Sequence, residues 1–219
     1  DWNNHAVRHA LADGTLETVI GSGFIGDGPE DLSDRTAPGA AGTTVDLNHP
    51  TQLVERADGK LLLVSWHNHK LRQYDPATGL VLITCGGAAG FGGDGQSALA
   101  AKVNQPTQVA VAPDGGQFIL DMRNQLIRRI RPDGIMETVA GTLATAGYAG
   151  DGGPPLKARF NFPAGSNPPP GGALALDPQG RLYISDTLNH VIRRIDFDAD
   201  KIETLAGTGV AGFSGDGGL

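Results

Sequence analysis

Three histidines in the first half of the chain could hold a metal ion. His67 and His69 are two residues apart, and His49 directly precedes a proline at the start of a predicted strand. Side chains two apart on an extended segment share a face, and histidines with an open coordination position can bind catalytic zinc. Because His67 falls in a predicted turn, we predict no bound metal or other cofactor. Zinc at His49, His67 and His69 is the alternative.

A Gly-Asp-Gly motif occurs four times, and its aspartates are Asp27, Asp94, Asp151 and Asp216. Each motif supplies one carboxylate, whereas calcium takes about 6–8 oxygen ligands and usually several carboxylates. We therefore predict structural loops rather than calcium sites. Glycine would allow a positive φ, and the aspartate would cap nearby backbone amides.

Polar side chains gather where three predicted repeats begin their first strand. Groups that converge from several repeats are typical of a small-ligand or peptide site. The alternative is that they only hydrate the channel or bond to loops. The candidate ligand-binding residues are Asn48, His49, Thr51, Gln52, Asn104, Gln105, Thr107, Gln108 and Asn161.

A second marker, Asn-His or Asn-Gln, recurs in step with the Gly-Asp-Gly motif. It stands at Asn4-His5, Asn68-His69, Asn124-Gln125 and Asn189-His190. Two markers that share one period indicate a structural unit copied in tandem. Since a catalytic group is normally needed once, recurrence in every unit predicts a structural hydrogen bond for this marker.

The strands and turns that position these residues are predicted most clearly in the third repeat. Alternating, valine-rich stretches at 107–112, 117–121, 126–131 and 135–141 predict strands, and Asp-Gly pairs between them predict tight turns. Four short antiparallel strands make one propeller blade. The other repeats follow the same order, except that the first retains only two strands.

The predicted fold is therefore all-β. It is a single partial β-propeller over 1–219, with about three and a half blades of four antiparallel strands. The predicted blades are 1–28 (the second half of a blade), 48–95, 104–152 and 161–217. A proline-rich insertion at 165–172 in the fourth repeat could shape a partner surface or be a tolerated loop.

The sequence Leu-Tyr-Ile-Ser-Asp-Thr-Leu-Asn-His-Val-Ile-Arg-Arg at 182–194 resembles NHL repeats, as does the Gly-rich loop at 211–218. Ser65 and Gln125 depart from that pattern. The resemblance implies a ring of about six blades, with the remaining blades supplied by a longer parent chain or another copy. It also suggests a secreted bacterial protein, extracellular or periplasmic, although the residues themselves leave the compartment unknown.

Charge argues against nucleic acid as the partner. The chain has 17 Lys and Arg against 24 Asp and Glu, a net charge of −7, and a negative chain repels phosphates. In the pairs Arg128-Arg129 and Arg193-Arg194, neighbouring side chains on a strand point to opposite faces. We expect one arginine of each pair to bridge to Asp121 or Asp186. No apolar run approaches the roughly 20 residues of a membrane span.

These observations favour a non-enzymatic scaffold that binds a protein, a glycan or a small ligand through the propeller face or the channel mouth. No catalytic triad, P-loop or dinucleotide motif stands out. The alternative is a propeller enzyme of the lactonase or lyase type with a metal in its central cavity. RNA binding is a third, disfavoured function. We expect Cys85 to be a buried, unreactive thiol.

Overall fold

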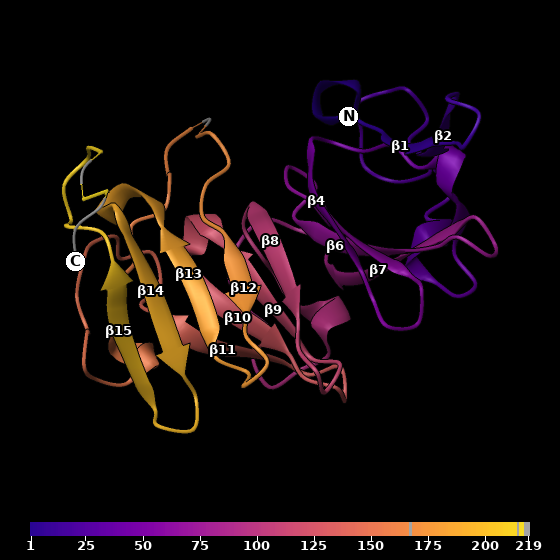
Figure 1. Ribbon diagram of the computed structural model, residues 1–219. Helices are drawn as coiled ribbons and strands as arrows, with labels where there is room; N and C mark the ends of the chain where they lie inside the picture. Colours follow the sequence, from indigo (N-terminus) through magenta and orange to yellow (C-terminus); the bar gives the residue numbers. More distant parts are fainter. Residues whose placement is uncertain (167, 214, 217–219) are drawn as a thin grey trace.

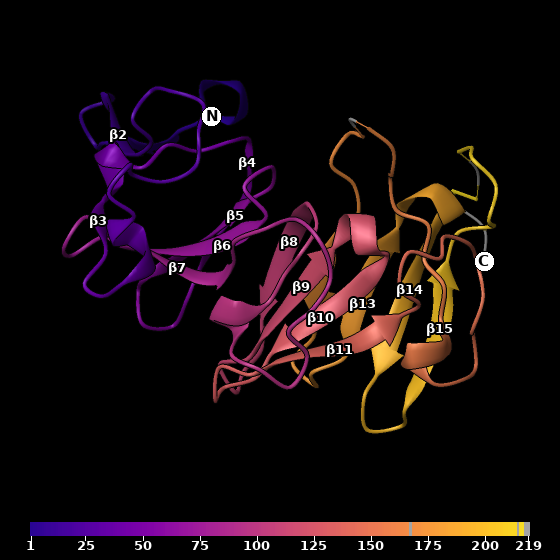
Figure 2. The same ribbon diagram turned by 180° about the vertical axis from the view of Figure 1, so that it is seen from behind.

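The computed structural model describes residues 1–166, 168–213 and 215–216. Its strands form four antiparallel sheets that follow one another along the chain, with the first and the fourth sheet at opposite ends of the array (Figures 1 and 2). The fold is an all-β propeller array, as predicted. Asn167 of the insertion and Gly217 of the last Gly-Asp-Gly motif lie outside the described residues.

The strand bounds agree with the sequence pattern. The first sheet pairs β1 (Val7–Ala10) with β2 (Leu16–Ile20). The second has the order β3-β7-β6-β5-β4, with strands β3 (Ala40–Ala41), β4 (Pro50–Glu55), β5 (Leu61–Ser65), β6 (Lys70–Asp75) and β7 (Leu80–Gly86). The third has the order β11-β10-β9-β8, with strands β8 (Pro106–Val111), β9 (Gln117–Asp121), β10 (Leu126–Ile130) and β11 (Met136–Gly141). The fourth has the order β12-β13-β14-β15, with strands β12 (Leu174–Leu176), β13 (Leu182–Asp186), β14 (Val191–Asp196) and β15 (Lys201–Ala206).

The second sheet differs from the four-stranded expectation. The segment before β4 passes along the outer edge of β7, where Ala40 pairs with Val81 and Ala41 with Leu80. This short β3 is a fifth strand, and no alternating pattern in the sequence predicts it. The third and fourth sheets have the predicted four strands.

Single turns of 3-10 helix connect the strands. One such turn follows the Gly-rich loop of the second repeat, η4 (Ala98–Ala100), and another follows that of the third, η6 (Pro155–Lys157). The remaining turns are η1 (Trp2–Asn4), η2 (Ser33–Arg35), η3 (Gly42–Thr44), η5 (Met122–Asn124) and η7 (Thr187–Asn189). Among the described residues, no helix has the length and apolar character that crossing a bilayer requires.

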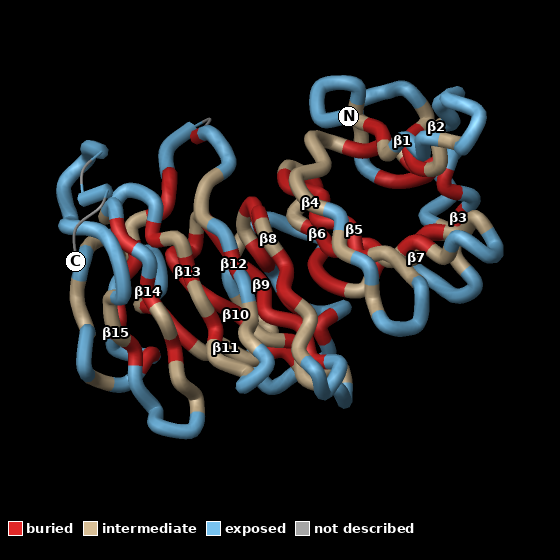
Figure 3. The backbone as a smooth tube through the Cα atoms, viewed as in Figure 1, coloured by how far each residue is buried: buried red, intermediate tan, exposed pale blue. Residues whose placement is uncertain are grey.

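The core lies between the sheets (Figure 3). One apolar cluster joins the third and fourth sheets and includes Phe118, Leu120, Phe160 and Leu182. Another joins the second and third sheets and contains Cys85, whose thiol pKa burial raises to about 12. The thiol is therefore buried and protonated at neutral pH, as expected. The adjacent first strands β4, β8 and β12 bring the predicted binding residues of different repeats together.

A glycine closes every fourth strand. Gly21, Gly86, Gly141 and Gly207 all have positive φ, between 82° and 119°. A Cβ at any of them would lie within 2.2–2.7 Å of the carbonyl oxygen of His5, His69, Gln125 or His190, respectively. The pairing of the third and fourth strands shifts register beside this contact. Only glycine fits such a close backbone approach, which explains why this position repeats.

Candidate binding site

The first three Gly-Asp-Gly loops each contact the third strand of the next sheet. The carboxylate of Asp94 lies 2.5 Å from Arg128 Nη2, that of Asp151 lies 2.6 Å from Arg193 Nη2, and that of Asp27 lies 2.8 Å from Arg72 Nη2. We call each ion pair an Asp–Arg clasp. The expected capping of neighbouring amides is therefore wrong for Asp27 and Asp94, whose hydrogen bonds go to side chains of the next sheet. Asp216 lies in the corresponding fourth loop.

Aromatic rings complete two of the clasps. Phe91 lies over the Arg128 guanidinium, 4.9 Å from its centre, and Tyr148 lies 5.3 Å from that of Arg193. Each ring stands three residues before the aspartate of its loop. A guanidinium over an aromatic face adds attraction, so each loop holds its arginine with a carboxylate and a ring.

The same arginines reach a buried aspartate at the end of the second strand, as the sequence predicted. Arg128 Nη1 lies 3.4 Å from Asp121, and Arg193 Nη1 lies 3.6 Å from Asp186. Burial raises the pKa of Asp121 to about 7 and also raises the pKa of Asp186. An unpaired charge would be costly at these buried positions, and the guanidinium supplies its partner.

These buried aspartates position the predicted ligand residues. Asp121 accepts a hydrogen bond from the backbone N–H of Asn104 at 2.7 Å. In the fourth sheet, Asp186 accepts the corresponding hydrogen bond from the backbone N–H of Asn161 at 2.8 Å. The segment that leads into each first strand is thereby tied to its own sheet, and the clasp ties that sheet to its neighbour.

The second sheet keeps this arrangement although Ser65 replaces the aspartate. Asn68 Oδ1 accepts the N–H of Asn48 at 2.9 Å, and the buried Asp34 lies 3.5 Å from Arg72 Nε. Lys70, also buried, adds a second cation to Asp27. The carboxylate lost at Ser65 is thus replaced from a different segment, which sequence alignment of the repeats does not reveal.

The recurring histidine or glutamine forms a hydrogen bond between sheets. His5 Nδ1 accepts the N–H of His49 at 3.1 Å, and His69 Nδ1 accepts that of Gln105 at 3.0 Å. Gln125 Oε1 accepts the N–H of Phe162 at 2.8 Å. Glutamine can replace histidine here because both present an acceptor at the same place. The predicted structural role of this marker agrees with these bonds.

Replacing Gln125 by alanine is expected to destabilise the protein by about 1–3 kcal/mol, because the buried N–H of Phe162 loses its acceptor. Gln125 Nε2 also donates to Phe162 O at 3.0 Å, and alanine removes that bond too. Gln125→His is the matched control, and restoring the acceptor should recover most of the loss. Urea unfolding followed by circular dichroism measures both variants. Equal losses in the two variants would contradict the hydrogen-bond explanation.

Two of the three metal candidates come together, and the third does not. The Nδ1 atoms of His49 and His67 are 3.0 Å apart, while His69 is directed to Gln105 in the next sheet. Burial lowers the pKa of both His49 and His67; the charge of His5 lowers that of His49 further, and the charges of His49, His69 and His5 lower that of His67. Both rings are therefore neutral at pH 7. Within the described part of the chain, no three His, Cys, Asp or Glu side chains are grouped to hold a metal.

Aromatic rings surround this histidine pair. Trp66 stacks on His67 with ring centres 3.8 Å apart, and Trp2 lies 4.5 Å from His49. Trp66 is buried, whereas Trp2 remains exposed. Neither tryptophan could be recognised as a site residue from the sequence, because single residues of this type carry no repeat signal.

Several predicted ligand residues bond the sheets to one another. Thr51 Oγ1 donates to Thr107 O at 3.0 Å, and Thr107 Oγ1 donates to Gly171 O at 2.9 Å. Gln52 Oε1 accepts the N–H of Val109 at 2.5 Å. Gln105 is buried, and the Asn48 Oδ1 atom lies 2.7 Å from His49 Nδ1. These side chains hold the first strands in place, and Gln108 is half-buried beside them.

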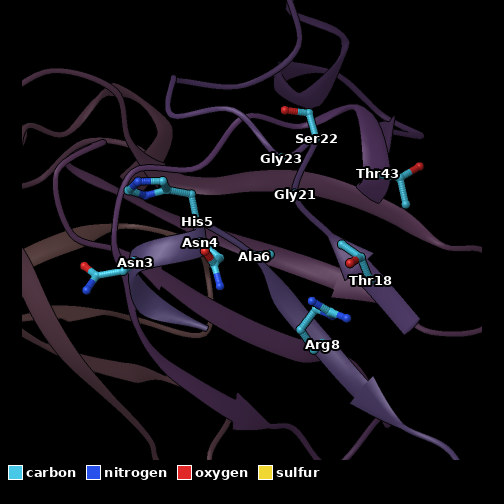
Figure 4. Close-up of a pocket in the computed structure, with 10 residues that line it drawn as sticks. All are labelled: Asn3, Asn4, His5, Ala6, Arg8, Thr18, Gly21, Ser22, Gly23 and Thr43. Atoms are coloured by element: carbon cyan, nitrogen blue, oxygen red, sulfur yellow. The ribbon is translucent and has the colours of Figure 1, made fainter. Parts of the chain in front are cut away.

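A cavity of about 640 Å³ lies where these first strands meet the insertion. We call it the channel cavity. It is lined by Thr51, Thr107 and Gln108 from the predicted set, together with Asp1, Trp2, Pro50, Pro170, Gly171 and Gly172. Pro170, Gly171 and Gly172 belong to the proline-rich insertion, which the sequence had marked as a possible partner surface. A second cavity, of about 520 Å³, lies against β1 and β2 (Figure 4).

No family model matches the chain. Over 97% of its length it is 26% identical to SUPPRESSOR OF QUENCHING 1, a chloroplastic protein of Arabidopsis thaliana. It spans only 20% of that protein. A 37-residue stretch is 49% identical to human NHL repeat-containing protein 2 and covers 17% of the chain and 5% of the human protein. This short match agrees with the resemblance to NHL repeats.

Three solved bacterial proteins have a similar fold. A Bacteroides thetaiotaomicron protein of unknown function matches 83% of the chain with a TM-score of 0.59 and 19% identity. An auxiliary nutrient binding protein of Bacteroides ovatus matches 91% with a TM-score of 0.52 and 17% identity. Virginiamycin B lyase of Staphylococcus aureus matches 92% with a TM-score of 0.51 and 14% identity. The chain spans 39%, 46% and 48% of these three structures, and the likeness concerns the fold.

Proposed function

We propose that the protein is a non-enzymatic binding scaffold that takes a glycan in the channel cavity. The observation that carries this proposal is the composition of the cavity wall. The exposed indole of Trp2 lies near hydroxyl and amide groups of Thr51, Thr107 and Gln108. An aromatic face with a few placed polar groups suits a sugar ring, which has apolar C–H faces and hydroxyl edges.

The rigidity of the wall supports this proposal. Thr51 is fixed by a hydrogen bond to the neighbouring first strand, and Thr107 by one to Gly171 of the insertion. A preformed wall loses little conformational entropy on binding, which favours recognition. The nutrient binding protein of similar fold is a further support, at the level of the fold. We also propose the segments 1–28, 48–95, 104–152 and 161–217 as successive blades of a ring of about six, its other blades coming from a longer chain or another copy.

The second candidate is a metal-dependent enzyme of the lactonase or lyase type. The 3.0 Å separation of the His49 and His67 Nδ1 atoms favours it, because two neutral imidazoles could share one metal ion. Zinc would be tested by metal analysis of the dialysed protein and of His49→Ala and His67→Ala. Stoichiometric zinc that both substitutions remove would support this candidate over the scaffold.

Binding is tested with an array of neutral and acidic glycans. We expect a ligand whose affinity falls at least about tenfold in Trp2→Ala, a loss of about 1.4 kcal/mol, and in Gln108→Ala. Phe24→Ala is the matched control, since Phe24 is an exposed aromatic in the loop of Asp27, outside the cavity lining. Glycan binding that is unchanged by Trp2→Ala, or the absence of any bound glycan, would contradict the proposal.

A further inference from the structure

A cavity of about 340 Å³ lies between the second and third sheets. It is lined by residues of β7 and η4 and of the turns that follow β4, β8 and β10. Both sheets are interior to the array, because the first and the fourth sheet lie beyond them (Figure 1). Small-ligand pockets have volumes from about 300 Å³ upward. We call this space the junction cavity, and none of its lining residues lines the channel cavity.

Four positions of this lining recur at the junction of the third and fourth sheets, where they are apolar. Strand register and the turn after each first strand define the correspondence. The side chains at that next junction belong to the apolar cluster of the two sheets or pack against it, and Phe197 stacks on Phe118 with ring centres 5.2 Å apart. The corresponding pairs are Arg56 and Ala112, Thr84 and Val139, Gln117 and Leu182, and Pro132 and Phe197. The junction cavity therefore has polar or smaller groups in places where the next junction packs apolar side chains.

Gln117 is a buried polar residue of this lining. It is 8% exposed, and its Oε1 atom has no hydrogen-bond partner in the part of the chain that the structure describes. The second and fourth sheets have Leu61 and Leu182 at the corresponding position. A buried amide without a partner costs free energy, so glutamine is unfavourable here for the fold alone and indicates a ligand. Because the last torsion of glutamine is broad, the amide can turn its oxygen or its nitrogen toward that ligand.

The lining of the junction cavity is positively charged although the chain as a whole is acidic. Arg56 and Arg131 line it, and no Asp or Glu of the described residues does. The exposed carboxylate of Asp133 holds Arg131 through Nε and Nη2. Arg56 Nε lies 3.4 Å from Asp58, and Arg56 Nη1 donates to Gln73 Oε1 at 3.1 Å. These contacts leave the Nη2 of Arg56 for an anionic group of a ligand.

We propose that the junction cavity binds a small aromatic hydroxy acid. Arg56 binds its carboxylate, and Gln117 bonds its hydroxyl, which can both donate and accept. The ring packs on Leu82 and Leu99, of which Leu99 is 56% exposed on η4. An aromatic body is favoured because Phe197 supplies a ring at the corresponding place of the next junction. A carboxylate alone would not suffice, since it has no proton to donate to the amide oxygen.

Isothermal titration calorimetry of the full chain tests this proposal, with para- and meta-hydroxyphenylacetate as the probes. We expect at least one isomer to bind with a Kd of about 1 mM or tighter. Gln117→Leu and Arg56→Ala introduce the residue types of the next junction, and each should weaken binding at least about tenfold. Phenylacetate, which lacks the hydroxyl, should bind the parent protein at least about tenfold more weakly than the better isomer.

Urea unfolding shows whether the variants remain folded, and Gln117→Leu should have a midpoint no lower than the parent, because it removes an unpaired buried amide. Gln179→Leu and Arg35→Ala are the matched controls, since both side chains are exposed and lie outside the cavity lining. Both controls should bind like the parent.

The proposal is overturned if neither isomer binds up to about 10 mM, or if Gln117→Leu and Arg56→Ala leave binding unchanged. Equal affinities for phenylacetate and the better isomer would also overturn it, because the hydroxyl would then have no partner in the cavity.

Discussion

Replacing Arg128 by alanine is expected to destabilise the protein by about 3–5 kcal/mol, because it leaves a buried carboxylate without its cation. Arg128 is fully buried and contacts Asp121, Asp94 and the ring of Phe91. Its loss opens the clasp between the second and third sheets and removes the charge opposite Asp121. Urea unfolding, followed by circular dichroism and tryptophan fluorescence, measures the free energy of unfolding.

The neighbouring Arg129 is the matched control. Its side chain is partly exposed and pairs with Asp114 at 2.5 Å on the surface. Exposed pairs contribute about 0–1 kcal/mol, so Arg129→Ala should cost no more than that. The two adjacent arginines differ mainly in the face of β10 on which they lie. Equal losses in the two variants would show that the buried ion pairs are not what stabilises this junction.

The second large effect is expected for Gly141→Ala, which should lower the free energy of unfolding by about 2–4 kcal/mol. Gly141 has a φ of 97°, and a Cβ there would lie 2.4 Å from Gln125 O, a backbone atom that cannot turn aside. The backbone of the closing turn must therefore shift. The same urea unfolding measures the loss.

Gly115→Ala separates crowding from backbone strain. Gly115 has a similar φ of 86°, but a Cβ there would meet nothing within 4 Å. This control should lose only about 1–2 kcal/mol, the cost of the left-handed conformation. If Gly141→Ala is no more costly than Gly115→Ala, the close approach to Gln125 does not explain the recurring glycine.

The strands are well predicted from the sequence because the same pattern of strand and turn residues recurs in each repeat. Valine-rich alternation and Asp-Gly turns placed the four strands of the third sheet within a residue or two of their bounds. The bridges from Arg128 to Asp121 and from Arg193 to Asp186 were predicted from the two faces of a strand. Local geometry was sufficient for these contacts.

Contacts between repeats were harder to predict. The aspartates of the Gly-Asp-Gly loops were assigned to neighbouring amides, yet the partner of Asp94 is Arg128, 34 residues away. The replacement of the Ser65 carboxylate by Asp34, and the fifth strand β3, also depend on how separate segments pack. Trp2 lines the channel cavity although it is far in sequence from the first strands and the insertion that also line it. Periodicity gives the position of each side chain in its repeat but not its partner in the next.

A double-mutant cycle on Asp94→Ala and Arg128→Ala tests most directly that Gly-Asp-Gly loops lock successive sheets together. Asp94→Ala with Arg193→Ala is the control cycle, because Arg193 pairs with Asp151 in a different junction. We predict a coupling free energy of at least about 1 kcal/mol for Asp94 with Arg128 and additivity within about 0.5 kcal/mol for the control. Additive losses for Asp94 and Arg128 would contradict the account.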